Sequence, residues 1–123
     1  MLARAVIVEA ARSGHHLLVP DLFDAECASG LARAVGRGRL GDDMWAGAWA
    51  GIACLPLERR PSRLLGLGAL RIAMERAIST YDAIYVALSD EEGIPLVTAD
   101  ARLARALYGS PYDVRLLEDV APR

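Results

Sequence analysis

The feature that most constrains the fold is the stretch STYDAIYVALSDEEGIPLVTADARLARAL, in which a helix, a buried strand and a second helix follow one another closely. Ser79 or Thr80 is a candidate cap for the first helix, which is expected to end at Gly93. The apolar run at residues 94–99 predicts the strand, and Asp100 is a candidate cap for the second helix. The inward face of the first helix is expected to hold Tyr81, Ile84, Tyr85 and Leu88. A unit of this kind indicates an α/β domain.

The rest of the chain continues this alternation. Asp21 is a candidate cap for a helix that follows a proline, and Asp42 or Asp43 can start another. Helices are expected over residues 2–12, 21–35 and 63–77 and from residue 42 or 43, and short strands over residues 16–20, 54–58 and 114–117. One side of the 63–77 helix carries Leu67, Leu70 and Met74. These elements predict a mainly parallel sheet, which binds ligands at the carboxyl ends of its strands.

Composition is consistent with one soluble domain over residues 1–123, because 54% of the residues are hydrophobic and the net charge is only −2. We expect a cytoplasmic protein without a membrane partner, since the longest uncharged run, residues 44–57, is too short to span a bilayer. No large positive field indicates nucleic acid. All 14 basic residues are arginines, whose planar group suits phosphate, although a bias towards arginine codons explains this equally well.

Three carboxylates stand out by position, because each lies near the start of a predicted helix. Glu26 is near the edge of an apolar stripe, Asp82 is in a first helical turn, and Asp100 directly follows the strand. Helix starts crowd along one edge of a parallel sheet, so the three acids are expected to converge and to repel one another unless a cation lies between them. Carboxylates and water are the ligands of Mg²⁺ or Mn²⁺, which can activate water for phosphodiester hydrolysis.

Each carboxylate also has a structural explanation. Asp100 can serve only as a helix cap, Asp82 can complement the helix dipole, and Glu26 can pair with an arginine. Taken singly, these explanations have the better odds. The metal-site hypothesis therefore rests on the three residues together.

The segments YDAIYVALSDEEGIPLVTADARLARAL and LLVPDLFDAECASGLARAV resemble the PIN-domain family, in particular its VapC-type toxins. The resemblance implies a Rossmann-like α/β/α sandwich and a Mg²⁺- or Mn²⁺-dependent endoribonuclease, the toxin of a type II toxin–antitoxin pair. It implies Glu26, Asp82 and Asp100 as catalytic and metal-binding residues, with Thr98 as a supporting hydroxyl. It further implies an RNA substrate, a VapB-type antitoxin and a homodimer.

The chain departs from this family at two places. The family's first, central strand and its aspartate are missing before the predicted helix at residues 2–12, and Ala77 replaces a polar residue that often precedes the YDA motif. A start assigned too late, which truncates the N-terminus, a decayed gene, or a partner that covers the gap would each explain the first departure. We favour the first explanation, because the remaining elements look intact.

These observations leave two function classes open. The leading hypothesis is RNA cleavage, with Arg33, Arg37 and Arg102 as candidate phosphate contacts. The alternative is a catalytically impaired PIN-fold binding protein that keeps its antitoxin or self-association surfaces; a phosphatase ranks last, because no nucleophile motif is present. A groove at Trp45 and Trp49 can receive an antitoxin helix, although either tryptophan can instead belong to the core or to a dimer interface.

Overall fold

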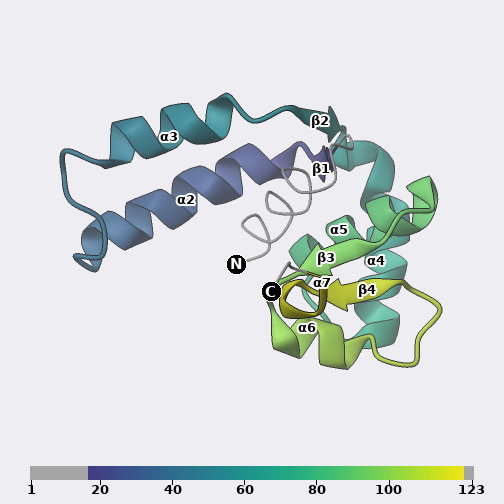
Figure 1. Ribbon diagram of the computed structural model, residues 1–123. Helices are drawn as coiled ribbons and strands as arrows, with labels where there is room; N and C mark the ends of the chain where they lie inside the picture. Colours follow the sequence, from purple (N-terminus) through teal and green to yellow (C-terminus); the bar gives the residue numbers. More distant parts are fainter. Residues whose placement is uncertain (1–16, 121–123) are drawn as a thin grey trace.

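The computed structural model describes residues 17–120, so the helix predicted over residues 2–12 lies outside the described residues. The described part alternates helices and parallel strands, which confirms the α/β prediction (Figure 1). In chain order the elements are β1 (Leu17–Pro20), α2 (Leu22–Gly36), α3 (Trp45–Ala53), β2 (Leu57–Arg60), α4 (Ser62–Arg76), α5 (Thr80–Glu92), β3 (Leu96–Thr98), α6 (Ala101–Ala106), β4 (Val114–Leu116) and α7 (Leu117–Val120).

The strands of the described region form two separate parallel pairs rather than one sheet. β1 pairs with β2, with Leu17 opposite Leu57, and β3 pairs with β4, with Leu96 opposite Val114. Helix α5 contacts both β1 and β3 and so connects the two pairs.

The larger core cluster lies around α4 and α5, which make the most extensive contact between any two elements of the described region. The buried face of α4 consists of Leu65, Ala69 and Ile72, and it packs against the buried side chains of α5. Residues of β3 and α6 complete this cluster. Burial of this apolar surface is the main force that fixes the positions of α5 and α6.

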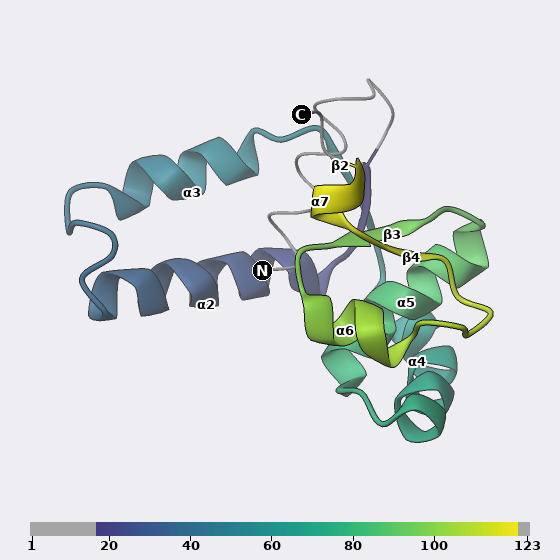
Figure 2. The same cartoon turned by 60° about the horizontal axis from the view of Figure 1, so that its bottom comes forward.

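Helices α2 and α3 form a hairpin that projects from the rest of the molecule in both views (Figures 1 and 2). A smaller core cluster anchors its base, where Phe23 of α2 and Val19 of β1 are fully buried. Asp21 lies at the N-cap position of α2, as predicted, but its side chain makes no capping bond there. It accepts hydrogen bonds from the backbone N–H and the hydroxyl of Ser62 instead, so it joins the base of the hairpin to the start of α4.

Three details differ from the sequence predictions. Tyr81 is 67% exposed, so its predicted inward orientation is wrong, whereas Tyr85 is buried as expected. Helix α3 begins at Trp45, after the predicted start at residue 42 or 43, and β2 begins at Leu57 rather than at residue 54. Within residues 17–120, no helix has the length and apolar character needed to cross a membrane.

Candidate functional site

Asp100 caps α6, and its structural explanation is therefore confirmed. Its Oδ1 accepts hydrogen bonds from the backbone N–H groups of Arg102 at 2.9 Å and Leu103 at 3.3 Å. The Asp100 N–H donates to Oγ1 of the fully buried Thr98 at 3.0 Å, so β3 fixes the turn that carries the carboxylate. Within the described residues, Oδ2 makes no hydrogen bond. Capping and ligand binding are thus compatible, because they use different oxygens.

Asp82 lies in the first turn of α5, where it is partly buried. Its N–H donates to Oγ of Ser79 at 3.1 Å, which confirms Ser79 as the helix cap. Desolvation raises the pKa of the Asp82 carboxyl; the Ser79 hydroxyl lowers this pKa, the charge of Asp100 raises it, and Arg102 lowers it. The net result is a raised pKa, so burial and the charge of Asp100 outweigh the Ser79 hydroxyl and Arg102.

Glu26 lies near the start of α2 and is also partly buried. The hydroxyl of Tyr85, on α5, donates a hydrogen bond of 2.5 Å to its Oε1. Desolvation raises the pKa of the Glu26 carboxyl, the Tyr85 bond lowers it, the charge of Asp82 raises it, and Arg33 lowers it. The explanation of Glu26 as the partner of an arginine is wrong within residues 17–120, because its one hydrogen bond there is with a tyrosine.

The structure brings the three predicted carboxylates into one electrostatic group with Asp82 at its centre, since Asp82 interacts with both Glu26 and Asp100. It does not assemble them as a closed set of ligands: in the described part of the chain, no three His, Cys, Asp or Glu residues are arranged to hold a metal ion. The donors nevertheless fit a hydrated divalent cation, because Mg²⁺ commonly takes one or two carboxylates and keeps several waters. Asp82 and Glu26 are both partly buried, and the pKa of each carboxyl is raised. A cation bound between them would stabilise their charged forms.

Two of the arginines named from the sequence lie near these acids. Arg102 acts on the charge of Asp82, and Arg33 acts on that of Glu26. Arg33 also donates from Nη1 to Oγ of Ser29 at 2.9 Å on the exposed side of α2. The group therefore combines carboxylates with guanidinium groups, a combination that can bind a cation and a phosphate side by side.

Tyr85 is the site residue that sequence reasoning missed. Its position on the inward face of a helix predicts a core residue, and it is only 3% exposed. Sequence offers one weak signal, because a buried tyrosine hydroxyl needs a hydrogen-bond partner. The identity of that partner follows only from the fold, since Glu26 and Tyr85 are 59 positions apart in the chain.

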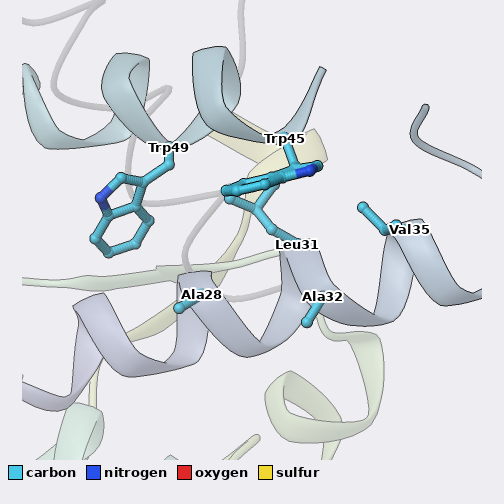
Figure 3. A pocket seen from close by; sticks show the side chains of 6 residues that line it. All are labelled: Ala28, Leu31, Ala32, Val35, Trp45 and Trp49. Carbon is cyan, nitrogen blue, oxygen red and sulfur yellow. The ribbon is translucent and has the colours of Figure 1, made fainter. Parts of the chain in front are cut away.

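A second candidate surface is an apolar groove of about 540 Å³ between α2 and α3 (Figure 3). Trp45 and Trp49 of α3 face α2 across this groove, and they are 50% and 38% exposed. The remaining lining comes from α2: Ala28, Leu31, Ala32 and Val35. The core explanation for the tryptophans is wrong, because neither side chain is buried.

The chain is similar to known proteins over most of its length. The family profile of the PIN domain matches residues 2–106. VapC ribonuclease Mb0985 of Mycobacterium bovis and Ribonuclease VapC9 of Mycobacterium tuberculosis are each 39% identical to the chain over 92 residues, which cover 75% of this chain and 71% of each relative. Ribonuclease VapC1 of Mycobacterium tuberculosis is 33% identical over 100 residues, covering 80% of this chain and 72% of the relative.

These matches confirm the family resemblance, which implies the same three carboxylates that stand out by position in the sequence. The profile covers most of the chain, including all three carboxylates, and the relatives share a third or more of the aligned residues. The chain therefore belongs to the PIN-domain family, and its curated relatives are VapC ribonucleases.

Proposed function

We propose that this chain is a divalent-metal-dependent endoribonuclease and the toxin of a type II toxin–antitoxin module, built as a single PIN-like domain over residues 1–123. The observation that carries the proposal is the electrostatic group of Asp82, Glu26 and Asp100, found in a chain whose relatives are VapC ribonucleases. An enzyme that cleaves cellular RNA acts in the cytoplasm, which is where we place it.

The proposed roles follow from the geometry of the side chains. Asp82, Glu26 and the unbonded Oδ2 of Asp100 would together hold Mg²⁺ or Mn²⁺ and orient the attacking water. Thr98 supports Asp100 through its backbone N–H. When bound, such a cation supplies an activated water and neutralises charge on the scissile phosphate.

The arginines would act on the substrate rather than on the cation. Arg33 and Arg102 lie beside the carboxylates, so their guanidinium groups can bind phosphates that flank the scissile bond. Arg33 acts on the charge of Glu26 and Arg102 on that of Asp82, whereas Arg37 acts on neither. We therefore propose Arg33 and Arg102 ahead of Arg37 as phosphate contacts.

Replacement of Asp100 tests the site. Asn keeps the helix cap but removes the charge, whereas Ala also loses the cap, at about 1 kcal/mol of stability. We expect Asp100→Asn to lower Mn²⁺-dependent cleavage of an RNA pool by roughly a hundredfold or more while the fold stays intact, because metal-assisted catalysis supplies several kcal/mol. The matched control is Asp90→Asn, at an exposed position on α5, which should cleave like the unmodified chain. Full activity of Asp100→Asn would remove this residue from the site.

One observation favours the second candidate function, a catalytically impaired PIN-fold binding protein. The described residues do not present three metal ligands together, as a fully formed site would. A folded chain that binds the antitoxin but cleaves no RNA in Mn²⁺ would establish this alternative in place of the nuclease.

We further propose that the groove between α2 and α3 receives an amphipathic helix of a VapB-type antitoxin. The groove is lined by apolar side chains from two helices, which is the form that accepts a helix. The exposed residues Arg37 and Arg39 lie just beyond the C-terminal end of α2, the helix that forms one wall of the groove. This charge predicts acidic residues on the rim of the bound antitoxin helix.

We also propose that the outer face of α4 forms a homodimer interface. The face carries four large apolar residues that are 51–74% exposed: Leu64, Leu67, Leu70 and Met74. The opposite face of α4 is in the core, so the helix is apolar on two opposite faces. This pattern is typical of a helix that is covered by other protein surface on both faces.

Charge on α4 favours a second copy in antiparallel orientation. Arg63 lies in the first turn and Glu75 in the last, which is the reverse of what the helix dipole favours. Neither makes an ion pair within residues 17–120. Both are equally distant in sequence from Ala69, so a two-fold axis near that residue places Arg63 of each copy beside Glu75 of the other.

A further inference from the structure

Tyr85 connects the two helices that carry Asp82 and Glu26. It lies on α5, one turn after Asp82, with a side chain that is only 3% exposed. Its hydroxyl donates to Oε1 of Glu26 on α2 at 2.5 Å, the short distance typical of a hydroxyl bonded to a carboxylate. An uncharged tyrosine hydroxyl is a hydrogen-bond donor, and a carboxylate accepts, so the pair is chemically matched.

Without the Tyr85 bond, the Glu26 carboxylate would have no hydrogen-bond partner among residues 17–120. Its flexible side chain could then rotate the carboxylate into solvent. Among the influences on Glu26, the Tyr85 bond is the one that holds the carboxylate inside, and a buried hydroxyl resists losing its partner.

From this hydrogen bond and the burial of the Tyr85 ring we infer that Tyr85 is a positioning residue: its hydroxyl keeps the Glu26 carboxylate beside Asp82, so that the two acids are ready to act on one divalent cation. The inference rests on the proposed function, since it assigns Tyr85 to the same metal site. Tyr85 touches neither cation nor RNA in this role, and it leaves Oε2 of Glu26 without a hydrogen bond in the described part of the chain.

Tyr85→Phe tests the inference, because it removes only the hydroxyl oxygen. We expect the dissociation constant for Mn²⁺, measured by calorimetric titration of the full chain, to rise about tenfold or more, as is usual when a residue that orients a metal ligand is lost. The matched control is Tyr81→Phe on the same helix, where the ring is 67% exposed; its Mn²⁺ affinity should equal that of the unmodified chain. Thermal unfolding without metal shows whether each variant remains folded.

A double-mutant cycle with Glu26→Ala separates positioning from packing. If Tyr85 acts through Glu26, Tyr85→Phe has no further effect on Mn²⁺ affinity once Glu26 is replaced. An equal penalty in both backgrounds, or a Tyr85→Phe variant that binds Mn²⁺ like the unmodified chain, would overturn the inference alone. An unmodified chain that binds no Mn²⁺ would overturn the proposed metal site as well.

Discussion

Asp82 shows how one residue can oppose stability and serve function. Its carboxylate lies partly out of water, and the neighbouring charge of Asp100 disfavours its ionisation further. Because its pKa is raised in the folded chain above the ordinary 3.8, the folded state holds the Asp82 proton more tightly than the unfolded state does. Ionised Asp82 therefore lowers stability, and this loss is complete once the pH exceeds both pKa values. Such groups occur more often at functional sites than elsewhere.

Asp82→Asn should accordingly stabilise the metal-free chain at pH 7 while it weakens RNA cleavage. The gain should shrink as the pH falls towards 3.8, since Asp82 then becomes neutral in the folded state and next in the unfolded state. Urea unfolding in EDTA at pH 7 and at pH 4.5 measures both effects. A variant that is less stable than the unmodified chain at pH 7 would show that Asp82 is a structural residue that supports its helix.

Two helices end in the left-handed conformation with different residues. Helix α4 ends at Ala77 with φ 54°, and α5 ends at Gly93 with φ 67°. The left-handed conformation costs a residue with a side chain about 1–2 kcal/mol, a cost that glycine avoids. Ala77 is exposed, so side-chain packing does not compensate. The end of α4 is therefore a weak point of the fold.

Ala77→Gly should stabilise the chain by roughly 0.5 kcal/mol, because relief of the backbone exceeds the added freedom of glycine in the unfolded chain. Gly93→Ala is the matched opposite change and should destabilise by about 1 kcal/mol. A Cβ at Gly93 would meet nothing within 4 Å, so only backbone conformation is altered. Equal midpoints of chemical unfolding for Ala77→Gly and the unmodified chain would contradict this explanation.

At the level of elements, local signals predicted most of the structure. The predicted caps are confirmed: helix α5 begins after Ser79 and ends at Gly93, and α6 begins after Asp100. These positions were predictable because a cap depends only on neighbouring residues. Contacts between distant segments were not predictable in the same way. Asp21 bonds to Ser62 instead of capping its own helix, and Tyr85 reaches Glu26.

Helix α4 shows where periodicity reaches its limit. Its apolar residues lie on two opposite faces. One face, with Leu67, Leu70 and Met74, is exposed, and the other, with Leu65 and Ile72, is buried. Periodicity alone cannot choose between two apolar faces. The metal-site hypothesis likewise needed all three carboxylates together, with the family resemblance as support, since each carboxylate alone fits an ordinary helix start.

At the scale of the molecule, residues 17–120 present two apolar surfaces that we assign to different partners. The α2–α3 hairpin projects from the domain and carries the groove, whereas the exposed stripe of α4 belongs to the element that packs on α5 (Figures 1 and 3). Because they lie on separate elements, the two surfaces can be altered independently. Large exposed apolar areas of this kind commonly mark sites of protein association.

Reciprocal variants test these assignments. Leu67→Glu should convert a dimer to a monomer, measured by light scattering, without weakening antitoxin binding, because it places like charges at the proposed two-fold interface. Trp49→Ala should weaken binding of the cognate antitoxin at least tenfold without changing the mass of the free chain, as truncation of an interfacial tryptophan commonly does. A chain that is monomeric before mutation would refute the dimer, and unchanged antitoxin affinity in Trp49→Ala would refute the groove.

We propose above all that the carboxylates of this PIN-domain chain hold a divalent cation, which activates water for RNA cleavage. The most direct measurement is the initial rate of cleavage of an RNA pool by the purified chain as Mn²⁺ is increased, with EDTA added at the end. The initial rate should rise from zero, saturate, and return to zero with EDTA, because the bound cation supplies the activated water. Cleavage that persists in EDTA, or no cleavage at any Mn²⁺ concentration by a chain shown to be folded, would contradict this proposal.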